Sequence, residues 1–114
     1  MIKITVSVDA EQAIRQIEMS GHAGAGEYGE DIVCAAVSSQ VISVENSLEH
    51  LLNAQKTVEV DEVSGGYLKL VTPKDNSMQK EHDAQLLLRH LVYALEVIQD
   101  SYPEYIKIKI QSSK

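Results

Sequence analysis

The only cysteine of this sequence follows a histidine within the segment that is richest in glycine. Residues 21–38 read Gly-His-Ala-Gly-Ala-Gly-Glu-Tyr-Gly-Glu-Asp-Ile-Val-Cys-Ala-Ala-Val-Ser and contain four of the six glycines. If His22 lies beside Cys34, it can accept the thiol proton and form the thiolate–imidazolium pair that cysteine hydrolases use. We therefore predict that Cys34 is a nucleophile and His22 its base. The alternative is that Cys34 is a small buried residue on an alanine-rich helix face and His22 an ordinary loop residue.

Neighbouring residues are candidates for supporting or substrate-binding roles. Asp31 lies three residues before Cys34 and Ser38 four residues after it, so all three would share one helix face. Asp31 either caps the helix or orients His22, and Ser38 could hydrogen-bond the thiol or a substrate group. Tyr28 could shield the site or stack on substrate, or it could pack locally. We expect a mobile functional loop before the helix, with these small residues in it: Ala23, Gly24, Gly26 and Gly29.

The predicted helix would add its own electrostatics to the site. We expect it to begin near Asp31, which places Cys34 about three residues inside it. Unpaired amides and the positive end of the helix dipole favour an anion at this position. They would stabilise a thiolate, and free amides there could also hold an oxyanion.

Other chemistries fit the sequence less well. Gly24, Gly26 and Gly29 match the spacing of a dinucleotide-binding loop, but the acids at positions 27, 30 and 31 would repel a pyrophosphate. A single cysteine also leaves no resolving thiol for a redox cycle. The remaining histidines lie on or near polar helix faces without partners at metal-ligand spacing: His50, His82 and His90. We therefore predict no cofactor and no metal.

Length and charge set broad limits. The 114 residues suit one domain over residues 1–114, and a composition that is 44% hydrophobic without Trp or Phe requires an aliphatic core. The net charge of −7, from 17 acids and 10 bases, would repel nucleic acid and attract a basic partner. No apolar run could span a membrane, and a strand pattern replaces a signal peptide at the start. We expect a soluble, cytoplasmic protein.

Alternating apolar and polar residues predict most of the strands. They lie at residues 2–8 and 106–110, and the second of these is expected inside the sheet. Residues 57–63 and 67–71 also alternate and flank a Ser-Gly-Gly turn, so we predict that they form a hairpin.

Apolar residues at three- and four-residue steps predict two long helices. The first covers residues 31–52, and the second begins after Asp75 or Ser77 as its cap. Residues 11–19 fit either a helix capped by Asp9 or a strand. The expected buried face of the first helix is Val33, Val37, Val41, Val44, Leu48 and Leu51. That of the second is Ala84, Leu87, Leu88, Leu91, Leu95 and Ile98.

The glycine-rich segment resembles the signature of the ribosomal-processing cysteine proteases, called Prp. The matching residues are Gly21-His22-Ala23, Gly29, and Asp31-Ile32-Val33-Cys34-Ala35-Ala36-Val37-Ser38. The resemblance extends over most of the chain, through the hairpin to the Tyr-Pro pair at residues 102 and 103.

The resemblance implies a cysteine endopeptidase that removes the N-terminal extension of a large-subunit ribosomal protein and so supports ribosome assembly. It implies that Cys34 and His22 are the catalytic pair, with Gly21, Asp31 and Ser38 at other positions of the signature. It also implies a homodimer, a loop that moves on substrate binding, and a strand at residues 11–19. The fold class is then α/β of the α+β type. One mostly antiparallel or mixed sheet would carry two long helices in the order strand-strand-helix-strand-strand-helix-strand.

An alternative interpretation places the protein in another functional class. The chain could be a non-enzymatic ribosome-associated or protein-binding module, in which the glycine-rich loop recognises a partner and Cys34 only packs. This reading predicts that Cys34→Ala keeps the function, whereas the protease reading predicts its loss.

Overall fold

The computed structural model describes residues 1–21, 28–61 and 66–112, and for residues 28–31 only the course of the backbone. The elements follow the predicted order of two strands, a helix, two strands, a helix and a strand. Their bounds are β1 Ile2–Val8, β2 Ile14–Ser20, α1 Tyr28–His50, β3 Thr57–Val60, β4 Tyr67–Val71, α2 Met78–Ser101 and β5 Ile106–Ser112.

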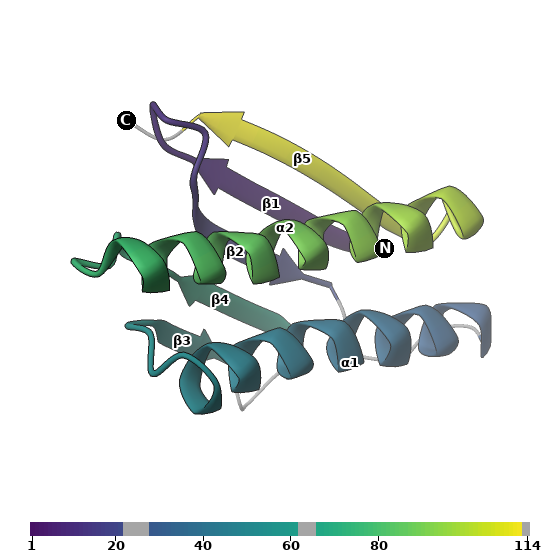
Figure 1. Ribbon diagram of the computed structural model, residues 1–114. Coiled ribbons are helices and arrows are strands. Elements are labelled where there is room, and N and C mark those ends of the chain that lie inside the picture. Colours follow the sequence, from purple (N-terminus) through teal and green to yellow (C-terminus); the bar gives the residue numbers. More distant parts are fainter. Residues whose placement is uncertain (22–27, 62–65, 113–114) are drawn as a thin grey trace.

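The five strands form one sheet in the order β3-β4-β2-β1-β5. β5 runs parallel to β1 and the other pairs are antiparallel, so the prediction of a mixed sheet is confirmed. Both helices lie side by side on one face of this sheet, and no helix of the described residues lies over the other face (Figure 1). The fold therefore has two layers, with the core between them.

The last strand is not inside the sheet, as its alternating isoleucines suggested. Among the described residues β5 pairs with β1 alone and forms one edge, where Ile106 is fully buried but Ile110 is half exposed. Lys107 and Lys109 are exposed. Lysines are common on edge strands because they oppose pairing with further strands. Alternation alone did not reveal this, because an edge strand with one buried face has the same pattern as an interior one.

The ambiguous segment before the first helix is a strand, β2, and a turn precedes it. The carboxylate of Asp9 accepts hydrogen bonds from the backbone amides of Glu11 (2.9 Å) and Ala13 (3.0 Å). Gln12 has a φ of 68°, which reverses the chain between β1 and β2. Asp9 thus caps a turn with the same chemistry that would cap a helix, which explains why the sequence fitted both structures.

The two helices bury the predicted faces with one exception. In α1 the core positions are Val33, Val37, Val41, Val44 and Leu48. Leu51 was also predicted to be buried, but it lies beyond the end of the helix and is 74% exposed. In α2 the buried residues are Ala84, Leu88, Leu91, Val92 and Leu95, and Leu87 and Ile98 pack against them. Ser77 is the N-cap of α2, and its side chain accepts the amide of Lys80.

Candidate active site

Cys34 lies on the face of α1 that packs against the sheet. Its side chain belongs to the hydrophobic core and is 7% exposed, while Val33 and Val37 beside it are completely buried. Ser38, one helical turn further along, is only partly buried. Cys34 and Ser38 share one side of α1, and Ser38 is the more exposed of the two.

The start of α1 corrects the predicted role of the helix end. The helix begins at Tyr28 rather than near Asp31, so Cys34 lies six residues after the first helical residue. Asp31 is inside the helix and is not its N-cap. The electric field of a helix end falls off within the first turn, so this field stabilises a thiolate at Cys34 less than expected. The unpaired amides of the helix end also lie about one turn before Cys34. Acidic residues are favoured in the first turn as well as at the cap, and the sequence did not separate these positions.

Several predicted site residues lie outside the described part of the chain. These are His22 and three residues of the expected loop, Ala23, Gly24 and Gly26. Gly29 and the backbone of Tyr28 form the start of α1. The structure therefore places Cys34, Ser38 and Gly21 in detail, and brings Cys34 and Ser38 onto one face of α1.

Gly21 has a backbone reason to be glycine. Its φ is +80°, and a Cβ atom at this position would collide with the carbonyl oxygen of Met1. Its amide donates a hydrogen bond to the carbonyl oxygen of Gly66 (2.9 Å), which extends the pairing of β2 with β4 by one step. β2 ends at Ser20, so the positive φ of Gly21 sets the direction in which the chain leaves the strand.

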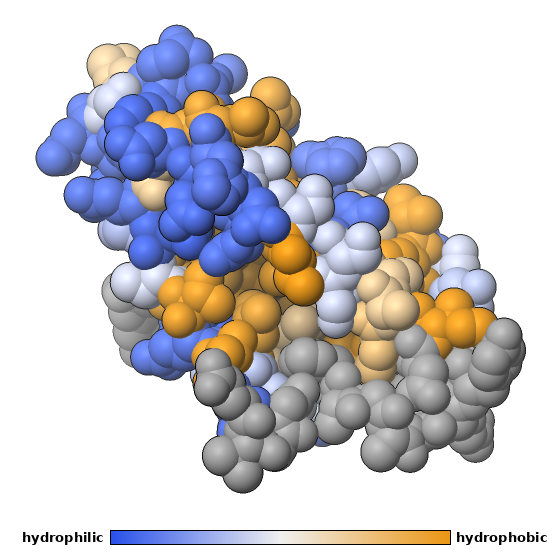
Figure 2. Space-filling view, turned by 90° about the horizontal axis from the view of Figure 1, so that it is seen from below, coloured by the Kyte–Doolittle hydropathy of each residue, from blue (hydrophilic) through white to orange (hydrophobic). Residues whose placement is uncertain are grey.

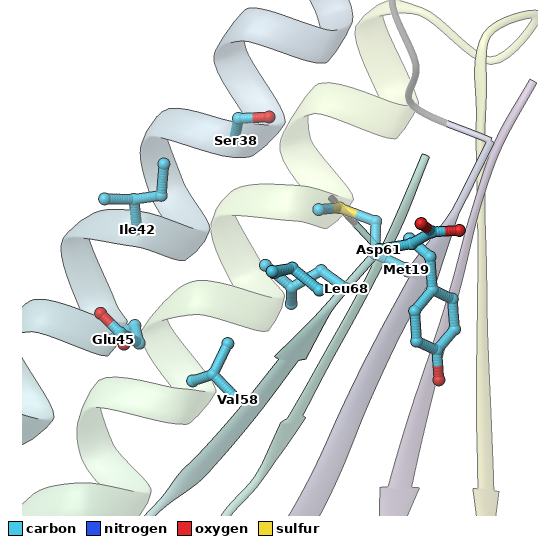
Figure 3. Close-up of a pocket in the computed structure, with 9 residues that line it drawn as sticks. Met19, Ser38, Ile42, Glu45, Val58, Asp61 and Leu68 are labelled. Carbon is cyan, nitrogen blue, oxygen red and sulfur yellow. The ribbon is translucent and has the colours of Figure 1, made fainter. Parts of the chain in front are cut away.

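A pocket of about 340 Å³ opens beside Ser38, between α1 and the sheet. Ser38 and Ile42 project into it from α1, and Val58, Leu68 and Met19 face them from three strands (Figure 3). Its full lining is Met19, Ser38, Ile42, Glu45, Val58, Val60, Asp61, Tyr67 and Leu68. Most of these side chains are apolar, so the pocket is suited to an apolar group of a substrate.

Of the residues that line this pocket, only Ser38 is among the site residues predicted from the sequence. Ile42 is 53% exposed and lies off the core stripe of α1, and Val60 is 51% exposed on β3. An isoleucine next to a complete core stripe and two valines on a short hairpin strand were the available signals. They indicate exposed apolar groups, but only the fold brings them together.

The charged groups around the pocket are mostly paired. The carboxylate of Glu45 accepts a hydrogen bond from Nζ of Lys56 at 3.0 Å, and this bond raises the pKa of Lys56. The hydroxyl of Tyr67 donates to Glu18 at 2.6 Å, which, with partial desolvation, raises the pKa of Tyr67 to about 12. Tyr67 thus stays protonated at neutral pH, and the pairing of Glu45 with Lys56 leaves the pocket mainly apolar.

The described residues contain no group of three or more His, Cys, Asp or Glu side chains that could hold a metal ion, and the prediction of no metal remains a prediction. Neither helix combines the length and apolar character that a membrane span needs, as far as the described residues extend.

Comparison with known proteins identifies relatives along almost the whole chain. A family model described as cysteine protease Prp matches residues 1–107. The ribosomal processing cysteine protease Prp of Bacillus subtilis (strain 168) is 30% identical over 108 residues, which cover 95% of this chain and 96% of the relative. The protein of the same name from Staphylococcus aureus (strain Mu50 / ATCC 700699) is 31% identical over 95% of this chain and 97% of its own length.

Solved structures agree with this relationship. The crystal structure of SMU.848 from Streptococcus mutans has a TM-score of 0.87 at 33% identity and covers 99% of this chain and 96% of its own. The S. aureus ribosomal processing protease Prp in complex with a substrate peptide has a TM-score of 0.85 at 28% identity. The same protease with a covalently linked product peptide has a TM-score of 0.82 at 30% identity. Each of these two covers 96% of this chain and 99% of its own. The chain therefore belongs to the cysteine protease Prp family and is a cysteine peptidase.

Proposed function

We propose that this peptidase removes the N-terminal extension of a large-subunit ribosomal protein, with Cys34 as nucleophile and His22 as general base. One observation carries the assignment of the nucleophile: a cysteine protease needs a cysteine, and this chain has only one. The names of the B. subtilis and S. aureus relatives support a ribosomal protein as substrate. The S. aureus structure with a covalently linked product peptide supports covalent catalysis.

In the proposed reaction, His22 takes the proton of the Cys34 thiol, and the thiolate attacks the carbonyl carbon of the scissile peptide bond. The tetrahedral intermediate collapses to a thioester as the new amine leaves with the proton from His22. A water molecule, deprotonated by the same imidazole, then hydrolyses the thioester and restores the thiol. Two protein groups suffice for these steps, so the proposal includes no cofactor.

Supporting roles are proposed for the other signature residues. The hydroxyl of Ser38 faces the pocket one turn from Cys34, which favours a contact with bound substrate. Gly21 sets the start of the His22 segment through its turn. Asp31 orients His22 or contacts the loop, and Tyr28 contacts substrate. The loop that includes Ala23, Gly24 and Gly26 closes over the bound peptide, whereas Gly29 belongs to the start of α1.

The proposed partner agrees with the charge of the protein. Ribosomal proteins are basic, and this chain carries a net charge of −7. We propose that residues 1–114 form one catalytic domain that acts in the cytoplasm, where it supports ribosome assembly without contacting nucleic acid directly. The homodimer implied by the family is part of the proposal, and sedimentation equilibrium would test it.

The first prediction concerns cleavage. N-terminal peptides of the large-subunit ribosomal proteins from the same organism are incubated with the protein, and the products are identified by mass spectrometry. We expect one peptide to be cut once. Cys34→Ala, Cys34→Ser and His22→Ala should each lower kcat/KM by roughly a thousand-fold or more, because each removes a group that acts in the transition state. His82→Ala is the matched control, since His82 is an exposed histidine on α2.

The same set of variants separates this proposal from a non-enzymatic binding module. A wild-type protein that leaves the whole peptide panel intact, or a Cys34→Ala variant that still cleaves, would disprove the proposed chemistry.

A further inference from the structure

The outer edge of β3 lies beside the pocket. β3 is the last strand of the sheet on this side, and no strand lies beyond it in the part of the chain that the structure describes. Val58 and Val60 point from β3 into the pocket. The pocket therefore has a side wall whose backbone can still pair with another strand.

The register shows which backbone groups of β3 point outward. The amide of Asp61 donates to the carbonyl oxygen of Tyr67, so Asp61 and Tyr67 occupy a hydrogen-bonded position of the hairpin. In an antiparallel pair such residues alternate with residues whose N–H and C=O groups point the other way. Val58 and Val60 are opposite Leu70 and Leu68 at these alternate positions. Their N–H and C=O groups therefore point away from β4.

The pocket and this edge have the dimensions of a short extended peptide. Ser38 and Glu45 mark the two ends of the helical wall, and seven residues of helix measure about 10 Å. An extended chain rises about 3.3 Å per residue, so the groove accommodates about three residues. Val58 and Val60 are two residues apart, as are the residues of a strand whose backbones face the same neighbour.

The surface around the groove is apolar where such a peptide would lie. α1 and β3 form the lower border of the molecule in Figure 1, and the view from below shows apolar side chains at the surface in the middle of this face (Figure 2). Ile42 on the helical wall and Val60 on the strand wall are each about half exposed. A side chain that entered between them would cover both.

We propose that the stretch of substrate beside the scissile bond binds as an additional strand on the outer edge of β3 and inserts an apolar side chain into the pocket. Strand addition satisfies the outward groups of Val58 and Val60 and fixes the peptide along α1, whose face leads through Ser38 to Cys34. Side chains of a strand alternate, so every second residue of this stretch faces the pocket. This inference rests on the proposed function, since it concerns the substrate of the same site.

The test is a backbone scan of the peptide that the wild-type enzyme cleaves. Each amide beside the scissile bond is methylated in turn, which removes one donor and keeps the side chain. We expect KM to rise about 3- to 10-fold at every second position on one side of the bond, because each lost hydrogen bond has a modest net worth. A parallel alanine scan should identify the apolar side chain in the pocket. The positions sensitive to the two scans coincide for antiparallel addition and alternate for parallel addition.

A variant of the enzyme tests the backbone hydrogen bonds between β3 and the peptide from the side of the enzyme. Val58→Pro removes an outward N–H, and proline is tolerated on an edge strand at such a position. Val58→Ala is the matched control, because it also shortens the side chain but keeps the N–H. We expect Val58→Pro to raise KM about 3- to 10-fold above Val58→Ala with little change in kcat. Thermal unfolding of both variants verifies that the sheet is intact.

The outcomes distinguish this inference from the function on which it rests. If the wild-type enzyme cleaves the peptide but methylation has no two-residue period, and the two Val58 variants share one KM, strand addition is wrong and the protease assignment remains. If no peptide is cleaved by the wild-type enzyme, the proposed substrate itself is wrong.

Discussion

At the scale of single residues, the burial of Cys34 determines what its partner must do. The thiol lies in the core beside Val33 and Val37, and it is beyond the first turn of α1. Burial disfavours a charged group, and the helix end is too far to compensate fully. A thiolate at this position therefore depends on a nearby cation. In the proposed pair that cation is protonated His22, so removal of the imidazole should affect the ionisation of the thiol as well as proton transfer.

Alkylation of Cys34 by iodoacetamide provides the second prediction. The rate follows the thiolate fraction, so its dependence on pH reports the ionisation of the thiol. We expect the wild-type midpoint to lie below that of an ordinary thiol, about pH 8.5, and His22→Ala to raise it by roughly one unit or more. His82→Ala should leave the profile unchanged. Identical profiles for the wild-type protein and His22→Ala would show that His22 does not stabilise the thiolate.

At the scale of elements, the spacing of apolar residues predicted the type of each helix and strand and the face that it buries. The alternation in β1 and the stripe on α1 were sufficient because each reflects one buried face. The predicted start of α1 was wrong by three residues, since an aspartate such as Asp31 is favoured both at a helix cap and in the first turn. The position of β5 at an edge depends on how strands are ordered, which alternation does not encode.

In the candidate site, too, some residues could be predicted from the local sequence and others only from the fold. Cys34 was identifiable because it is the only cysteine and lies in a distinctive segment of the sequence. Ser38 was identifiable from its spacing of one helical turn. The rest of the pocket joins residues from four separate elements, including Ile42 on α1, Val58 on β3 and Leu68 on β4. Their proximity is a product of the sheet order, so no local pattern could have predicted it.

Arg15 connects β2 to α2 and provides the third prediction. Its guanidinium donates to Glu81 at 2.7 and 3.3 Å and to Asp9 at 2.9 Å. Burial alone would raise the pKa of Glu81. Hydrogen bonds from Arg15 and from the amide of Asp75 lower this pKa by more than burial raises it, so the net shift is downward. A carboxylate whose pKa is lowered by folding stabilises the protein above its unfolded-state pKa, and this stabilisation is lost as the pH falls through the folded-state value.

We therefore expect Glu81→Gln to lower the free energy of unfolding by roughly 1 to 3 kcal/mol at neutral pH, with a smaller difference from wild type in acid. Urea unfolding measured between neutral pH and the acid range gives both values. Asp83→Asn is the matched control, because Asp83 is an acid on α2 whose side chain forms hydrogen bonds with the exposed neighbours Gln79 and His82. A difference that stays constant with pH would contradict the assigned role of Glu81.

At the scale of the whole molecule, the two-layer fold puts the groove at one border of the sheet. α1 and β3 form its two walls, and both helices of the described residues cover the same face of the sheet (Figure 1). The groove itself is mainly apolar because Glu45 is paired with Lys56. The excess of 17 acids over 10 bases is therefore a property of the wider surface. Charge attraction and apolar contact are separate contributions to substrate binding. Added salt distinguishes them, because it screens the charge attraction.

Salt dependence is the last prediction. Attraction between a protein of net charge −7 and a basic peptide acts over long distances and is screened as ionic strength rises. Between low salt and about 0.5 M salt we expect kcat/KM for the cleaved peptide to fall several-fold, through KM rather than kcat. The matched control is the same peptide with its lysines and arginines outside the groove-binding stretch replaced by glutamine. This peptide should be cut more slowly at low salt and should respond little to added salt, since its apolar contacts with the groove remain. If both peptides respond equally, the acidic surface has no part in substrate capture, and binding is due to the groove alone.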